Sequence, residues 1–179
     1  MNTPNNKRKK DSIQKIEKAF IELLQTKEIN EINVTTLVKK AEINRSTFYV
    51  NYIDIYDLAD KLKEKMFNNV LELYKEETIN KTHSYDYLKL FKHIKENKLY
   101  YKTLFKLNFD FTVYYDYQLE DEQAIKYYGT TKNMNYHIEF FKAGISAIIK
   151  IWLLNDCKES PEEINEIIKS EYKGKSLEY

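Results

Sequence analysis

Four side chains suited to binding nucleic acid lie close together in one short stretch of the sequence. Residues 44–51 read NRSTFYVN and carry Arg45, Ser46, Thr47 and Tyr49. An arginine guanidinium can donate two parallel hydrogen bonds to guanine O6 and N7 in a major groove. Hydroxyl side chains suit phosphate oxygens, which position a protein on a duplex without reading its sequence. The stretch therefore predicts a contact with DNA, if a helix presents these residues together.

Two short helices joined by a tight turn are predicted to position this stretch. Asn33 can cap a helix over 34–41, and Asn44 can cap a second helix over 45–51, because asparagine oxygens accept hydrogen bonds from free N–H groups at a helix start. The sequence EIN lies between them as the turn. The residues expected to face the core are Leu37, Val38, Ala41, Phe48 and Tyr52.

Longer amphipathic helices are predicted on both sides of this pair. Apolar residues at helical spacing predict a helix from about 11 to 26, with Asp11 as its N-cap, and another from about 54 to 75. Three helices in this order form a helix-turn-helix domain, whose second short helix enters the major groove. The alternative is a three-helix domain with exposed polar residues and no DNA partner.

Basic residues near the N-terminus extend the predicted DNA surface. Lys7, Arg8, Lys9 and Lys10 form a run that either is a solvated tail or lies along the DNA backbone. The residues predicted to contact DNA are Lys9, Lys10, Asn33, Thr35, Thr36, Asn44, Arg45, Ser46, Thr47, Tyr49 and Asn51.

The segment INVTTLVKKAEINRSTFYVNYIDIYDL, residues 32–58, resembles the TetR-type (TetR/AcrR) transcriptional regulators. It has the family's Ala before the turn, a polar cap, and then Thr-Phe-Tyr. The resemblance covers about residues 9–75, and the segment FFKAGISAIIKIWLLNDCKESPEEI resembles the last two helices of some members. It implies a homodimer that reads two half-sites of a palindromic operator, and a C-terminal core that often binds a small inducer. It also implies that Tyr49 contacts phosphate, Arg45 bases, and Thr47 either.

Two positions depart from the family's pattern. Glu42 stands where the family usually has a glycine after the Ala, so either a less favourable backbone conformation or a slightly different turn is expected. Ile55 stands where a lysine commonly contacts the phosphate backbone. The loss of that contact is expected to weaken binding to DNA or its dependence on salt.

The C-terminal sequence predicts two helices with surplus apolar surface. A helix over 133–155 is apolar on nearly every side, and a second begins at the Ser160-Pro161 cap, with Glu163 three residues after Ser160. Two such helices from each subunit can form a four-helix dimer interface, and the alternative is an ordinary monomeric core. The predicted interface residues are Gly144, Ala147, Ile148, Ile151, Ile164, Ile167 and Ile168.

Aromatic residues of the C-terminal half could line a cavity for a small-molecule effector. Equally, they could fill the core, and they indicate no class of ligand. The candidate residues are Tyr100, Tyr101, Phe105, Phe109, Phe111, Tyr114, Tyr115, His137 and Trp152.

The composition favours a soluble, all-α protein, and the family resemblance implies two domains. Only 3 Gly and 2 Pro occur in 179 residues, and no apolar run reaches the length of a membrane span. The single Cys157 fits a cytoplasmic protein, and the scattered histidines predict no metal site. The sequence has no glycine-rich phosphate loop, nucleophile elbow or zinc-protease motif, so no cofactor and no enzyme are predicted. The predicted domains are residues 1–53, for DNA, and 54–179, for regulation and dimerisation. The first hypothesis is a repressor released by a small molecule; the alternative is a DNA-bound adaptor or a regulator that acts through a protein partner.

Overall fold

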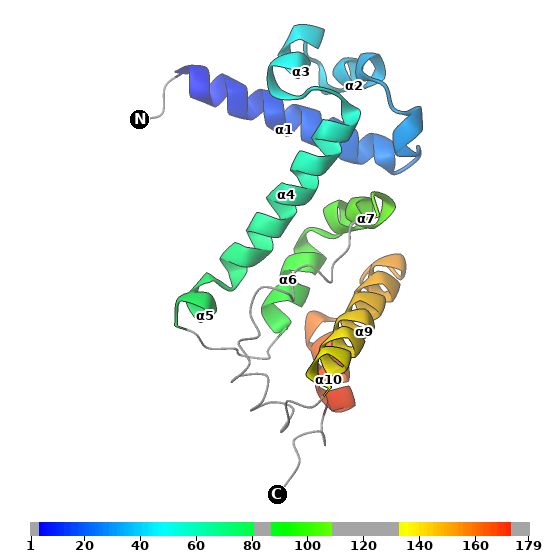
Figure 1. Cartoon of the computed structure of the whole chain (residues 1–179). Helices are drawn as coiled ribbons and strands as arrows, with labels where there is room; N and C mark the ends of the chain where they lie inside the picture. Colours follow the sequence, from blue (N-terminus) through cyan, green and yellow to red (C-terminus); the bar gives the residue numbers. More distant parts are fainter. Residues whose placement is uncertain (1–3, 81–86, 109–132, 173–179) are drawn as a thin grey trace, which may run out of the picture. The chain divides into compact units, whose positions relative to one another are not determined.

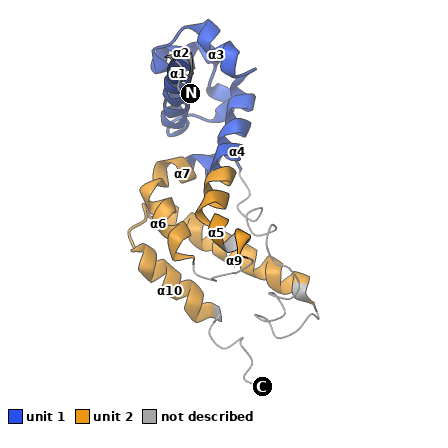
Figure 2. Ribbon diagram, turned by 90° about the vertical axis from the view of Figure 1, so that its left-hand side faces the viewer, with its two compact units in different colours: residues 1–66, 103–109 blue, residues 67–102, 110–179 orange. Residues whose placement is uncertain are grey.

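A computed structural model describes residues 4–80, 87–108 and 133–172, and within these ranges the chain is helical with no strand. It divides into two compact units, which Figure 2 distinguishes by colour. Unit 1 comprises residues 1–66 and 103–109, and unit 2 comprises residues 67–102 and 110–179. The predicted all-α class with an N-terminal helix-turn-helix is confirmed.

Unit 1 is built around three N-terminal helices and the first part of a fourth. In chain order, they are α1 (Pro4–Leu24), a 3-10 turn (Ile29–Glu31), α2 (Val34–Ala41), α3 (Arg45–Asn51) and α4 (Ile55–Leu73) (Figure 1). The helix α1 packs against both α2 and α3. The core of unit 1 is made of fully buried apolar side chains from all four helices: Ile16, Phe20, Leu24, Leu37, Phe48, Leu58, Leu62 and Met66.

The start of α1 corrects one prediction. The helix begins at Pro4 rather than at Asp11, so the basic run from Lys7 to Lys10 is helical and Asp11 lies inside the helix. Proline suits the first turn of a helix, and no glycine or further proline interrupts the residues that follow. Lysine and arginine are good helix formers, so the run continues the helix of the apolar segment behind it.

The end of α7 is hydrogen-bonded to the C-terminal end of α1 within unit 1. The helix α7 (Lys98–Lys106) carries Thr103, which is fully buried and accepts a hydrogen bond from Gln25 Nε2 at 3.1 Å. Lys106 Nζ donates to the Leu24 carbonyl at 2.7 Å. A cation that binds the last carbonyl groups of a helix also interacts favourably with the helix dipole, so Lys106 caps α1.

Unit 2 contains the end of α4, the short α5 (Lys75–Ile79), α6 (Leu88–Glu96), the start of α7, α9 (Met134–Leu154) and α10 (Pro161–Tyr172). The helix α6 ends at Glu96 with Asn97 as its C-cap, and α7 begins at the next residue, Lys98. The helix α10 packs on α6. Phe91 and Trp152 meet edge to face with ring centroids 5.8 Å apart, and both are buried.

The connection between α9 and α10 is held by specific polar contacts. Ser160 Oγ accepts from the Glu163 N–H at 3.1 Å, and Glu163 accepts from the Ser160 N–H at 2.7 Å, so the predicted capping box is confirmed. Asp156 accepts from Lys98 Nζ at 2.6 Å and from Lys102 Nζ at 2.8 Å. These hydrogen bonds lower the pKa of Asp156 from 3.8 to about 2, and the bond from Lys102 has the largest effect.

The helix α9 has two apolar faces, as its sequence predicted. One face is buried in unit 2 and includes Ile145, Ile149 and Trp152. The opposite face carries large exposed side chains: Tyr136, Phe140, Ile151 and Leu154. None of the described helices is both long enough and apolar enough to cross a membrane.

Candidate nucleic-acid interface

The turn between α2 and α3 is fixed by backbone hydrogen bonds. The Ile43 N–H donates to the Val38 carbonyl at 3.1 Å, and the Glu42 N–H donates to the Lys39 carbonyl at 3.4 Å. This pair of bonds defines a Schellman motif, which requires a left-handed residue after the helix. Glu42 adopts φ 54° and ψ 47°, so it has the less favourable conformation that the missing glycine predicted. The turn thus sets the direction in which α3 leaves α2.

The two predicted N-caps differ in what their side chains do. Asn33 Oδ1 accepts from the Thr36 N–H at 2.9 Å and from the Thr36 hydroxyl at 3.1 Å, so both side chains are part of the start of α2. Asn44 is the N-cap of α3, but its side chain makes no capping hydrogen bond. Asn44 is exposed, and its amide is therefore available to a ligand at this end of α3.

The seven residues of α3 divide into a buried anchor and an outward face. Phe48 is fully buried, as predicted, and Tyr52 just after the helix is buried as well. Burial, followed by the nearby Glu17 and Asp57 carboxylates, raises the pKa of Tyr52, so its hydroxyl stays neutral. The outward face exposes Arg45, Ser46, Tyr49 and Val50.

Thr47 and Asn51 line the side of α3 and are half-buried. Asn51 Nδ2 donates to the Thr47 carbonyl at 2.7 Å, so this amide group is bonded within its own helix. The Asn51 carbonyl accepts from Lys61 Nζ of α4 at 3.0 Å. Asn51 therefore helps to hold the end of α3, whereas Thr47 lines a recess together with residues of α1.

Arg45 is held in place by two neighbours rather than extending freely into solvent. Its Nη2 donates to the Tyr49 hydroxyl at 3.1 Å, and its Nη1 donates to Thr35 Oγ1 of α2 at 3.4 Å. The guanidinium also lies 5.5 Å from the centroid of the Tyr49 ring, within the range of a cation–π contact. The structure thus brings together three predicted residues, Thr35, Arg45 and Tyr49, in one exposed cluster.

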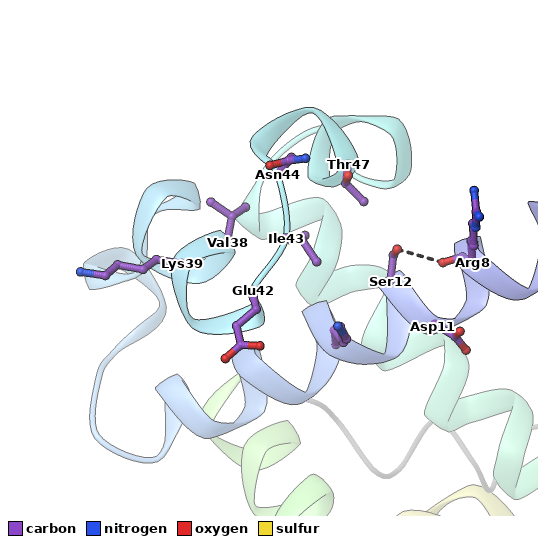
Figure 3. Close-up of a pocket in the computed structure, with 10 residues that line it drawn as sticks. Arg8, Asp11, Ser12, Val38, Lys39, Glu42, Ile43, Asn44 and Thr47 are labelled. Atoms are coloured by element: carbon purple, nitrogen blue, oxygen red, sulfur yellow. Dashed lines mark hydrogen bonds between the residues drawn. The ribbon is translucent and has the colours of Figure 1, made fainter.

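A polar recess of about 550 Å³ lies beside α3, between α1 and the turn (Figure 3). It brings Arg8 of the basic run close to Asn44 and Thr47 of α3. Its charge is mixed, because Asp11 and Glu42 also line it. Arg8, Asp11 and Glu42 were not among the residues predicted to contact DNA. Lys9 and Lys10, which were, are exposed on α1 and are not part of this lining.

The start of α4 gives the physical reason for the second departure from the family's pattern. Ile55 is only 6% exposed, so its side chain belongs to the core and could not reach a phosphate. The Asp57 N–H donates to Asp54 at 2.8 Å, and Asp57 accepts from the Ile53 N–H at 2.8 Å, so the two acids cap the helix. The Ile53 N–H and then Lys61 lower the pKa of Asp57.

The residues predicted for an effector pocket do not share one environment. Tyr101 and Trp152 are fully buried, Tyr100 and Phe105 are half-buried, and His137 is exposed. The remaining four candidates lie outside the residues that the structure describes: Phe109, Phe111, Tyr114 and Tyr115. The pocket therefore stays a prediction.

The predicted interface residues also separate by burial. Ile164 and Ile168 are buried within the chain, on the helix that packs against α6, so they stabilise unit 2 and have little surface to offer a partner. Ala147, Ile151 and Ile167 are exposed. Gly144 and Ile148 are partly exposed.

The comparisons with known proteins agree with this architecture. A model of the C-terminal region of TetR-type transcriptional regulators matches residues 81–172, more than half of the chain. The chain belongs to the TetR family of transcriptional regulators. TetR-family regulators bind DNA and dimerise.

Relatives and solved structures resemble this TetR-family chain over most of its length. It is 28% identical over 127 residues to the HTH-type dhaKLM operon transcriptional activator DhaS of Lactococcus lactis, in a match that covers 68% of this chain and 64% of that protein. This chain thus matches less than two thirds of that relative's length.

Two solved structures are similar in fold. One is a TetR transcriptional regulator from Streptococcus agalactiae, with TM-score 0.69, 20% identity, and 94% of this chain and 97% of that chain covered. The other is a dihydroxyacetone kinase operon activator DhaS, with TM-score 0.60, 23% identity, and 90% and 93% covered. At these identities the two structures support the fold alone.

Proposed function

We propose that this chain is a sequence-specific regulator that inserts α3 into the major groove of an operator. The observation that carries the proposal is the exposed cluster in which Thr35 and Tyr49 hold the Arg45 guanidinium. A guanidinium held in one position loses less freedom when it binds a guanine than a mobile one does. Ser46, Thr47 and the exposed amide of Asn44 would then donate hydrogen bonds to phosphate oxygens on either side of the groove.

The basic face of α1 is proposed to extend the contact along the DNA backbone. Lys9 and Lys10 are exposed, and Arg8 lines the recess beside Asn44 and Thr47. Because the run is helical, its charges have fixed positions on α1 instead of belonging to a flexible tail. Each phosphate contact should add roughly one unit to the salt slope of binding. Residues 1–53 are accordingly proposed as the reading head, with residues 54–179 as the regulatory and dimerisation domain.

The exposed face of α9 is proposed as the homodimer interface. Phe140, Ala147, Ile151 and Leu154 recur at spacings of three, four and seven residues, so they share one side of the helix. Phe140 is 68% and Leu154 is 73% exposed in the single chain. A Cβ added at Gly144 would meet nothing within 4 Å, so this side of α9 has room for a partner helix. Ile167 of α10, which is 44% exposed, is proposed to belong to the same interface.

The dimer can be tested by a charge placed on this face. Ile151→Glu should shift the protein toward a monomer in analytical ultracentrifugation, because pairing would bury the new carboxylate. The matched control is Asn135→Glu, which puts the same charge at an exposed position of α9 off the apolar side. If both variants have the same mass in solution as the wild type, the interface lies elsewhere.

Two modes of regulation fit such a dimer. In the first, a small molecule binds the regulatory domain in a conformation whose reading heads mismatch the operator, and the repressor is released. The second is activation, either as a DNA-bound adaptor or through a protein partner. It is favoured by the names of the two similar DhaS proteins, each an operon activator. A reporter driven by the bound promoter separates the two, because deletion of the gene raises expression in the first and lowers it in the second.

Selection from a random pool of duplex DNA tests the proposal itself. At near-physiological salt, the purified protein should enrich an inverted repeat with a guanine in each half-site. A dimer with one reading head in each half requires the two-fold symmetry of the site. If folded protein enriches no sequence, the proposal of a sequence reader is wrong.

A further inference from the structure

An exposed valine lies on the outward face of α3 that is proposed to enter the groove. Val50 is 75% exposed and lies two residues after the fully buried Phe48. Two residues correspond to about 200° around a helix, so Val50 points almost directly away from the core. Ser46 lies one turn earlier on the same side and is also exposed. Val50 is therefore among the residues that the floor of a groove would meet first.

The stability of the domain gives no reason for a valine at this position. Valine is a poorer helix former than alanine or lysine, and at 75% exposure its side chain contributes little to the core. Its χ1 angle has one strongly preferred rotamer in a helix, so its two methyl groups are held in a fixed direction. Such a side chain suits a small apolar target at a fixed position.

The major groove contains one apolar group that distinguishes base pairs. Thymine carries a 5-methyl group there, where cytosine has only a hydrogen, and the other groups that distinguish the bases are hydrogen-bond donors or acceptors. Contact with that methyl group removes apolar surface from water on both molecules. A phosphate or a donor group opposite Val50 would instead lose water without gaining a hydrogen bond.

We propose that Val50 is a specificity-determining residue that contacts a thymine 5-methyl group in each half-site of the operator. The inference rests on the proposed function, because it requires α3 to lie in the major groove. It adds a second element of readout to Arg45. Arg45 selects a base through hydrogen bonds, and Val50 selects a nearby base through an apolar contact on the same face of the same helix.

Replacement of thymine by deoxyuridine tests this contact, because it removes the methyl group and keeps the hydrogen-bonding edge. In the operator obtained by selection, each thymine is replaced in turn, in both half-sites. At one position the affinity of the wild type should fall by about fourfold per half-site, or roughly fifteenfold in all, the scale of one buried methyl group. The variant Val50→Ala should bind the thymine and uracil sites nearly equally.

Ile53→Ala is the matched control. Ile53 is 78% exposed, close to the value for Val50, but it lies in the connection after α3 rather than on the helix. This variant should keep the full thymine preference of the wild type. Binding of all three proteins is measured at the same salt concentration.

Several results would overturn the inference. The first is that the wild type binds the operator with unchanged affinity when uracil replaces thymine at any position. The second is that Val50→Ala keeps the full thymine preference of the wild type. If Val50→Ala leaves DNA binding unchanged and abolishes binding to another protein, the surface is a protein-binding site and the inference is wrong. These results differ from failure of the proposed function, in which no operator is enriched and Arg45→Ala has no effect. In that case, both proposals fail together.

Discussion

The substitution Glu42→Gly should stabilise the protein, although it deletes a whole side chain. Glu42 has φ 54° and ψ 47°, which places its Cβ close to the following carbonyl oxygen. A non-glycine residue in this conformation costs about 1–2 kcal/mol. Glycine avoids that cost but gains about 0.5–1 kcal/mol of extra freedom in the unfolded chain. The free energy of unfolding should therefore rise by roughly 0.5–1 kcal/mol.

The matched control for this prediction is Glu42→Ala. Alanine also removes the carboxylate, which lies unfavourably at the C-terminal end of α2, but it keeps the Cβ and hence the strain. The Gly variant should be more stable than the Ala variant by roughly 0.5–1 kcal/mol, which separates the backbone effect from the charge effect.

Thermal unfolding at one protein concentration provides the assay, since dissociation of a dimer would otherwise move the midpoint. For a chain of this length, 1 kcal/mol corresponds to about 2–4 °C in the melting temperature. The Schellman hydrogen bonds should persist in Glu42→Gly, so its preference among DNA sequences should equal that of the wild type. Equal melting temperatures for the Gly and Ala variants would refute the argument from backbone strain.

Three further predictions concern named contacts. Tyr49→Phe removes the acceptor that holds Arg45, so the ratio of affinities for operator and random DNA should fall by roughly fivefold in competition binding, besides any uniform loss of affinity. An unchanged ratio would contradict this prediction. Asp156 has a pKa lowered to about 2, so its bonds to two lysines should stabilise the fold above pH 4 and be lost as the pH falls toward 2. Asp156→Asn should therefore lower the melting temperature at pH 7 but not near pH 2, and equal effects at both would contradict it. Ser160→Ala should cost about 1 kcal/mol in urea unfolding through loss of the N-cap, whereas Ser170→Ala, near the far end of the same helix, should cost less.

Local chemistry explains why much of the reading head could be predicted from the sequence. The limits of α2 and α3 follow from Asn33, Asn44 and the apolar spacing around Phe48, all of which act within a few residues. The left-handed conformation of Glu42 also followed from a local rule, since a turn of this length requires it. The prediction of Asp11 as the N-cap was wrong, because a good capping residue does not mark the start of a helix when good helix formers precede it.

Contacts between distant segments could not be predicted in this way. No local pattern pairs Lys106 with the carbonyl of Leu24, or Thr103 with Gln25, because these residues meet only after the chain has folded. The burial of Ile164 and Ile168 depends likewise on where α6 lies. Val50, in contrast, could have been found, because its position opposite Phe48 follows from the helical period alone.

Readout of a base pair by Arg45 is the central claim, and binding of wild type and Arg45→Ala to single-base variants of the selected operator tests it most directly. The wild type should lose about 5- to 150-fold in affinity when the guanine of a half-site is replaced. Arg45→Ala should bind the operator with the replaced guanine and the original operator equally, and its affinity for random DNA should stay close to that of the wild type. If Arg45→Ala discriminates at every position as the wild type does, Arg45 does not read the operator, and α3 does not enter the groove as proposed.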